Sequence, residues 1–246
     1  MGDRRPLDVA FLEGDQLTDE VVRELWELRL EYLTLQKSRE DDWAYFRAFL
    51  DRDDASAFVF RDPQGTVQGF FTIAMFPVDA LDQRGLLLYS KYFYFHRAYR
   101  GHPASTLAPW RLLPLAVRRY GVRWLHFCTS AFPQSFVSLS RGSGNLHALG
   151  EPGISAWQQE ALTRFAREFY PDTFDEDAGL VRNQNVADEE GLPRGTEAQA
   201  LYERYERLNP TWREGNSLPV IFRVDPTLVV TNVRRNVRRL VRSLRG

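Results

Sequence analysis

The sequence predicts an α/β fold in one domain spanning residues 1–246, and three observations predict it. Short apolar runs typical of strands alternate along the chain with amphipathic segments of helical period. No internal repeat, low-complexity segment or linker interrupts that order. Apolar residues make up 43% of the 246 residues, enough to build one substantial core.

The first third of the chain predicts a strand, two helices and a hairpin. Thr18 and Ser38 each precede acidic residues and an apolar periodic segment, so each is expected to be the N-cap of a helix. The turn sequence Asp62-Pro-Gln-Gly65 separates two apolar runs, which predicts an antiparallel hairpin. The predicted strands are Leu7–Leu12, Ala55–Phe60 and Val67–Phe76.

The segment 86–120 organises the rest of the sequence. An aromatic-rich strand, Leu86–His96, follows a loop predicted for Pro77–Arg84. A short basic loop then leads into an amphipathic helix that ends at Tyr120. Pro109 falls in the first helical turn, where it is tolerated, whereas Pro114 is expected to kink or locally open the helix.

The second half predicts two strands, several helices and one acidic loop. The strands are Val122–Ser130 and Leu218–Val224; the helices are Pro133–Ser140, Ser155–Phe169, Thr196–Leu208 and Thr231–Leu244; and the loop is Asp172–Glu190. The last helix carries an apolar stripe opposite six arginines, namely Arg234, Arg235, Arg238, Arg239, Arg242 and Arg245.

Composition excludes several classes of protein. The net charge of −1 gives no global attraction to nucleic acid, and none is expected as a partner. Cys128 is the single cysteine, so no intrachain disulfide can form, and the four histidines show no metal-ligand spacing; no metal is expected. The chain has no apolar run long enough to span a bilayer and no signal peptide, so a cytoplasmic location is expected.

The basic loop is the one place where the sequence suggests chemistry. It reads Arg97-Ala-Tyr-Arg-Gly-His-Pro-Ala-Ser-Thr106 between a strand and a helix. Such a loop aims backbone N–H groups and a helix N-terminus at one point, which favours a phosphate ligand.

The element order and this loop resemble the GNAT superfamily, the general-control-type N-acyltransferases. The similarity covers roughly Leu7 to Ser140, with a closing strand near Leu218. It implies a GNAT-like mixed central sheet flanked by helices. The region at about 142–217 lies beyond the family's usual length and is expected to be a helical insertion, and the residue pattern itself predicts the basic C-terminal helix at about 231–246. It also implies coenzyme A or acyl-coenzyme A as co-substrate.

In the family, a motif of the form R/Q-x-x-G-x-G/A after the fourth strand binds the coenzyme A pyrophosphate. Arg100 and Gly101 match its common lead-in, but Pro103 stands where the next glycine is expected and supplies no N–H. The residues that the resemblance assigns to donor binding are Arg97, Arg100, Gly101, His102, Ala104, Ser105 and Thr106. The alternative is a structural loop with solvated arginines.

Two catalytic groups common in the family are missing here. Ser140 stands where a leaving-group tyrosine is expected, and Leu86–Phe95 contains no carboxylate base. An amine acceptor must lose a proton, and the candidates that remain are Tyr89, Tyr92 and His126, with Tyr94 on the same strand. His126 and Cys128 alternate along their strand and so share one face of it. They could act as a base and a nucleophile, or they could be two buried core residues.

The resemblance implies an acyltransferase that moves an acyl group from acyl-coenzyme A, or from an acyl carrier protein, to the amine of a small-molecule acceptor. One alternative is a catalytically inactive relative that keeps the fold and binds a ligand. Another is a protein that binds a surface or partner through its arginine-rich C-terminal helix. By its apolar positions alone, that helix gives at most weak peripheral membrane contact.

Overall fold

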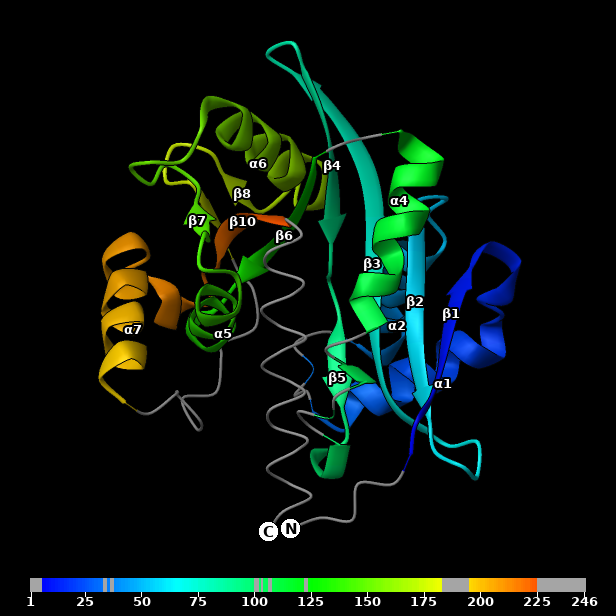
Figure 1. The fold of residues 1–246 in the computed structure, drawn as a ribbon. Coiled ribbons are helices and arrows are strands. Elements are labelled where there is room, and N and C mark those ends of the chain that lie inside the picture. The colour runs from blue at the N-terminus through cyan, green and yellow to red at the C-terminus, as the bar shows by residue number, and fades with distance from the viewer. Residues whose placement is uncertain are drawn as a thin grey trace, which may run out of the picture. The chain divides into compact units, whose positions relative to one another are not determined.

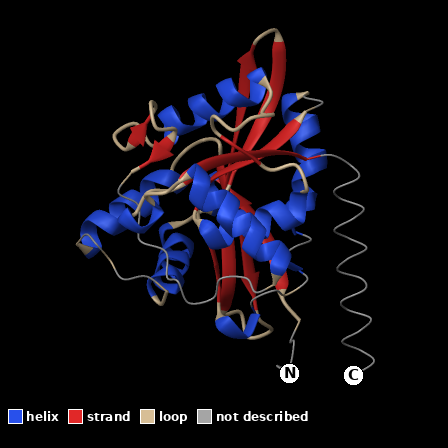
Figure 2. Ribbon diagram, turned by 90° about the vertical axis from the view of Figure 1, so that its left-hand side faces the viewer, coloured by secondary structure: helices blue, strands red, loops and turns tan. Residues whose placement is uncertain are grey.

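The computed structural model describes residues 6–32, 35, 38–99, 102, 104–105, 108–121, 124–182 and 195–224. It divides into two compact units. The described residues of 6–76 and 88–121 form the first unit, and those of 77–87 and 124–224 form the second. Both units combine helices with strands (Figure 2). The single domain predicted for 1–246 stays a prediction, and the C-terminal helix predicted at 231–246 lies outside the described residues.

The predicted fold class is confirmed: the protein is a mixed α/β fold with the GNAT-like order of elements. The strands follow the hydrogen-bonded order β1-β2-β3-β4-β6-β10-β7, and β5 pairs with β3 beside that path. Strands β1/β2, β2/β3, β3/β5, β6/β10 and β10/β7 pair antiparallel. A separate pair, β8 and β9, stands outside this sheet.

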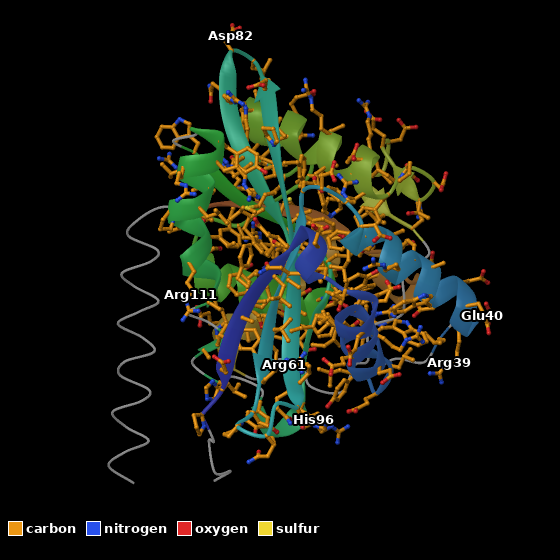
Figure 3. All side chains as sticks on the ribbon, turned by 90° about the vertical axis from the view of Figure 1, so that its right-hand side faces the viewer. Arg39, Glu40, Arg61, Asp82, His96 and Arg111 are labelled. Atoms are coloured by element: carbon orange, nitrogen blue, oxygen red, sulfur yellow. The ribbon has the colours of Figure 1, made fainter. Side chains whose placement is uncertain are left out.

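The first unit is a sheet with helices on both faces. In it, α1 and α2 lie on one face of β1–β3, and α4 crosses the other face (Figures 1 and 3). Thr18 and Ser38 cap α1 and α2 as predicted, accepting hydrogen bonds from the Val21 and Asp41 amides. The elements are β1 (Asp8–Glu13), η1 (Gly14–Gln16), α1 (Asp19–Leu30), α2 (Arg39–Leu50), β2 (Ala55–Arg61), β3 (Val67–Ala80), β5 (Phe93–Phe95), η2 (Arg97–Tyr99), η3 (Ala108–Arg111) and α4 (Leu112–Tyr120).

The second unit is built around β10, which pairs with β6 and with β7. Trp157 of α6 donates to the Gln83 carbonyl of β4, and Tyr205 of α7 donates to the Ala131 carbonyl of β6. The elements are β4 (Gln83–Tyr89), β6 (Leu125–Ala131), α5 (Pro133–Ser143), β7 (His147–Ala148), α6 (Ala156–Phe169), β8 (Phe174–Asp175), β9 (Leu180–Val181), α7 (Thr196–Leu208), η4 (Trp212–Glu214) and β10 (Leu218–Val224). Two strands are divided between the units: residues 77–80 of β3 belong to the second unit, and residues 88–89 of β4 belong to the first.

Two sequence predictions were wrong in detail. The predicted loop Pro77–Arg84 is instead a hairpin, because β3 continues to Ala80 and β4 begins at Gln83. The acidic loop contains the short strands β8 and β9. The helix predicted to end at Tyr120 is divided just before Pro114, because η3 covers Ala108–Arg111 and α4 begins at Leu112. Pro114 therefore lies in the first turn of α4, a tolerated position, and the division agrees with the expected local opening.

The β3–β4 hairpin turns on two residues with positive φ, Leu81 at 49° and Asp82 at 60°. Figure 3 places Asp82 at the hairpin tip. The left-handed conformation costs a branched residue such as leucine roughly 1–2 kcal/mol, and Leu81 is 60% exposed, so burial does not offset that cost.

Replacing Leu81 by glycine is therefore expected to stabilise the protein by about 1 kcal/mol, since glycine adopts positive φ without steric penalty. The free energy of unfolding in urea measures the change. Leu12→Gly, inside strand β1, is the control and should destabilise the protein. A loss of stability in Leu81→Gly would contradict this account of the turn.

Candidate functional site

The loop that the resemblance assigns to the donor begins directly after β5. His96, labelled in Figure 3, directly follows the last residue of β5. Glu31, the C-cap residue of α1, lies 3.1 Å from the Nε2 atom of His96. The 3₁₀ turn η2 follows, with Arg97 exposed. Of the predicted donor residues, the structure describes Arg97, His102, Ala104 and Ser105, whereas Arg100, Gly101 and Thr106 lie outside the described residues.

The described amides of this loop donate within the loop itself. The amide of His102 donates to the Tyr99 carbonyl at 3.0 Å, and the Ser105 amide donates to the His102 carbonyl at 3.1 Å. The Ala104 amide donates to His102 Nδ1 at 3.2 Å. Pro103 has no N–H. A phosphate at this position would therefore compete with internal hydrogen bonds, or use donors from the remaining loop residues.

Ser105 is held by the same loop. Its side chain donates to the His102 carbonyl at 2.7 Å, and the residue is only 8% exposed. The hydroxyl oxygen keeps acceptor capacity, but its proton is already used. If the Ser105 hydroxyl is to donate to a phosphate, it must therefore give up its hydrogen bond to the His102 carbonyl.

The single long strand predicted at Leu86–His96 is two strands, which corrects the sequence prediction. Strand β4 ends at Tyr89 and β5 starts at Phe93. The Tyr92 carbonyl accepts from the Thr72 amide at 2.9 Å, while its own amide donates to the Thr72 hydroxyl at 3.2 Å. Because a side chain replaces a backbone acceptor there, the regular ladder is interrupted at Ser90–Tyr92.

Tyr89 and Tyr92, two of the three predicted catalytic residues, pack under α2. Tyr89 is completely buried, and its ring meets Phe49 edge-on at 5.8 Å. Tyr92 is 5% exposed, and its ring lies 4.8 Å from that of Phe46. Through these contacts, both rings form part of the hydrophobic core of the first unit.

A buried ion pair that the sequence did not predict lies next to the Tyr92 ring. The Arg29 guanidinium of α1 donates to both carboxylate oxygens of Asp42 on α2, and Trp26 Nε1 donates to Asp42 at 2.7 Å. Arg29 is 5% and Asp42 7% exposed. One sequence signal could have indicated this ion pair: Arg29 is a charged residue on the apolar stripe of α1, where a charge needs a partner.

The pair also acts on neighbouring tyrosines. Burial raises the pKa of Tyr94, and the nearby Arg29 opposes that shift. Partial burial likewise raises the pKa of Tyr45; the charge of Arg29 opposes this rise, and the charge of Asp42 adds to it. Both phenols are therefore protonated near neutral pH, and neither is a ready proton acceptor.

His126, the third predicted catalytic residue, lies on β6 in the second unit. It is 6% exposed, and the Trp157 ring covers it at 4.6 Å. Burial, followed by the charge of Arg223, lowers the pKa of His126 to about 4. No residue in the described part of the chain hydrogen-bonds its Nδ1 atom. His126 is thus a neutral imidazole in a covered position.

Cys128 and Ser140 are also enclosed in the second unit. Cys128 is completely buried, and burial raises the pKa of its thiol well above the usual range, which favours the core role over the nucleophile. Ser140 lies on α5 and is 9% exposed. Its hydroxyl has no hydrogen-bond partner within the described ranges.

The described residues offer neither a metal site nor a membrane span. No group of three or more histidine, cysteine, aspartate or glutamate side chains in the described ranges is arranged to hold a metal ion. Likewise, none of the helices in the described part of the chain is long and apolar enough to cross a membrane.

Comparison with known proteins gives only distant structural likenesses. No protein-family profile matches the chain, and no curated protein matches it. A ribosomal-protein-alanine N-acetyltransferase from Brucella melitensis biovar Abortus 2308 is 21% identical, with a TM-score of 0.41 over 55% of this chain and 88% of the other. A putative acetyl transferase from Pyrococcus furiosus is 16% identical, with a TM-score of 0.42 over 60% and 100% of the two chains.

A predicted acetyltransferase from Clostridium acetobutylicum, solved with acetyl-coenzyme A, is 15% identical. Its TM-score is 0.38, over 51% of this chain and 81% of the other. At these values the likeness concerns the order and arrangement of elements, and no activity follows from it.

Proposed function

We propose that the protein transfers an acyl group from acyl-coenzyme A, or from a carrier-protein phosphopantetheine, to an amine. The observation that carries the proposal is the succession between residues 83 and 120: strand β4, a break, the short strand β5, a basic loop and helix α4. This is the succession in which the GNAT resemblance puts the donor loop. Arg97 and Arg100 supply positive charge there.

In such a transfer the acceptor nitrogen bonds to the thioester carbonyl carbon as the carbon–sulfur bond breaks. The acceptor loses one proton, and the leaving thiolate takes one up. Of the proposed catalytic residues, His126 has the unprotonated form that a base needs, but its low pKa makes it a weak base and Trp157 covers it. Tyr92 adjoins the strand break, so we place it first among the candidates.

The donor loop can be tested through Arg100. Arg100→Ala should weaken coenzyme A binding about tenfold, the effect of losing one charge-assisted hydrogen bond to phosphate. Isothermal titration calorimetry measures the affinity. Arg213→Ala is the control, since it removes an exposed arginine paired with Glu206 outside the loop. Equal affinity in wild type and Arg100→Ala would refute this placement of the phosphates.

A second candidate is a binding protein without catalysis. The observation that favours it is the internal use of the His102, Ala104 and Ser105 amides, together with the burial of Tyr89 and His126. Release of free thiol from acetyl-coenzyme A in the presence of an amine separates the two. Coenzyme A binding without amine-dependent thiol release would select the binding protein.

A further inference from the structure

Three aromatic rings surround the ammonium group of Lys91. Its Nζ atom lies 3.9 Å from the ring centre of Tyr45, 5.2 Å from that of Phe49 and 5.5 Å from that of Tyr92. All three distances fall within the range of cation–π attraction. We call these three residues, Tyr45, Phe49 and Tyr92, the aromatic cage.

The cage is assembled by two elements of the first unit. Tyr45 and Phe49 are four residues apart on α2, so they share one face of that helix. Tyr92 belongs to the break between β4 and β5, where both of its backbone groups are fixed by Thr72. The Phe49 and Tyr92 rings meet edge-on at 5.7 Å, so the walls also support each other.

The charged residues next to the cage do not repel a cation. Arg29 lies 5.2 Å from the centre of the Tyr92 ring, but Asp42 neutralises its charge through two hydrogen bonds. A second positive charge near Tyr92 therefore meets no uncompensated cation there. Tyr45 is 42% exposed, which leaves the cage open to solvent on one side.

We infer that the aromatic cage is a binding site for an organic ammonium ion, and that Lys91 fills it as an internal ligand. Recognition of this kind needs π faces around a positive charge, and the cage provides three. An external ammonium ion binds when the Lys91 side chain swings out. The inference does not depend on the proposed acyl transfer, because it concerns a ligand's charge and not a reaction.

The experiment uses tetramethylammonium chloride as the probe, at an ionic strength held constant with sodium chloride. Saturation transfer to the probe's methyl resonance in NMR measures its affinity. Lys91→Ala should bind the probe about tenfold more tightly than wild type, since the internal competitor is gone. Lys91→Arg, which keeps a cation, should resemble wild type.

Two further variants test whether the gain belongs to the cage. Lys91→Ala combined with Tyr45→Leu should lose the gain, because one π face is removed while bulk is kept. Arg23→Ala empties a cation–π contact with the single ring of Trp43 at 4.9 Å and should show no gain. The inference is overturned if Lys91→Ala binds no more tightly than wild type, or if the double variant keeps the full gain.

A measurement on the wild-type protein keeps the test independent of how the variants fold. The chain has two lysines, Lys37 and Lys91. Acetylation by an N-hydroxysuccinimide ester, followed by peptide mass spectrometry, gives the labelling ratio of Lys91 to Lys37. Saturating tetramethylammonium should raise this ratio severalfold by releasing Lys91, and an unchanged ratio would contradict the internal-ligand role.

Discussion

Replacing Asp42 by alanine is expected to destabilise the protein by about 3–5 kcal/mol, far more than the loss of an exposed ion pair. The change leaves the buried Arg29 guanidinium without its counter-charge and removes the acceptor of Trp26 Nε1. Urea unfolding at pH 7 measures the loss of stability, which is expected whether or not the protein is an enzyme.

Two variants make the cause identifiable. Asp51→Ala breaks the pair between the half-buried Arg47 and the exposed Asp51, and should cost less than about 1 kcal/mol. Replacing Arg29 and Asp42 together by methionine and leucine should recover most of the stability, because no uncompensated buried charge remains. If Asp42→Ala is no more damaging than Asp51→Ala, the buried pair does not anchor α1 to α2.

Acid is expected to weaken the fold through His126, by an amount approaching 3 kcal/mol below pH 4. The pKa of His126 is lowered to about 4 in the folded protein, against an ordinary value of 6.5. As pH falls below 6.5 the unfolded chain takes up the proton first, so the unfolded state gains stability. The stability that the neutral His126 contributes to the folded state is fully present above pH 6.5 and is lost as the pH falls toward 4.

The substitution His126→Gln removes this titration. Urea unfolding of wild type and variant at pH 7.5 and at pH 5 should show the wild type losing about 2 kcal/mol more than the variant over that interval. Parallel losses in the two proteins would show that His126 does not carry its proton differently in the folded and unfolded states.

Much of the fold follows from local sequence signals. Thr18 and Ser38 are caps because a hydroxyl followed by acidic residues suits the first helical turn, and both bonds are present. Strand β10 covers the predicted residues Leu218–Val224, an apolar run whose first five residues are buried. The helix predicted for Ser155–Phe169 forms with Ser155 as its N-cap. For the three helix caps the deciding hydrogen bonds lie within a few residues. Strand β10 was predicted from its apolar run alone, since its ladder partners lie on β6 and β7.

The errors arise where distant residues decide the structure, or where a turn departs from the residues that usually form it. The break after Tyr89 depends on the Thr72 hydroxyl, which lies on another strand, so nothing in the run 86–96 announces it. The hairpin tip uses Leu81 and Asp82 at positive φ, where turn chemistry predicts glycine or asparagine. The ion pair of Arg29 with Asp42 joins two helices and is invisible to either helix alone.

In the candidate site, too, features set by neighbouring residues could be predicted, and features set by packing could not. The position of the basic loop after β5 could be predicted, because strand, loop and helix are adjacent in sequence. The internal hydrogen bonds of His102, Ala104 and Ser105 could not, since they depend on the path of the loop. Nor could the burial of Tyr89 and His126, which depends on the packing of α2 and of α6.

The proposed acyl transfer rests on one claim, that the protein binds an acyl-coenzyme A. The most direct test is a thermal-unfolding series with coenzyme A, acetyl-coenzyme A and medium- and long-chain acyl-coenzyme A. A ligand of the native state at a hundredfold excess over its Kd contributes about 2.7 kcal/mol, which should raise Tm by several degrees. We expect that rise with acetyl-coenzyme A or a longer acyl derivative. An unchanged Tm with every member of the series would contradict the claim.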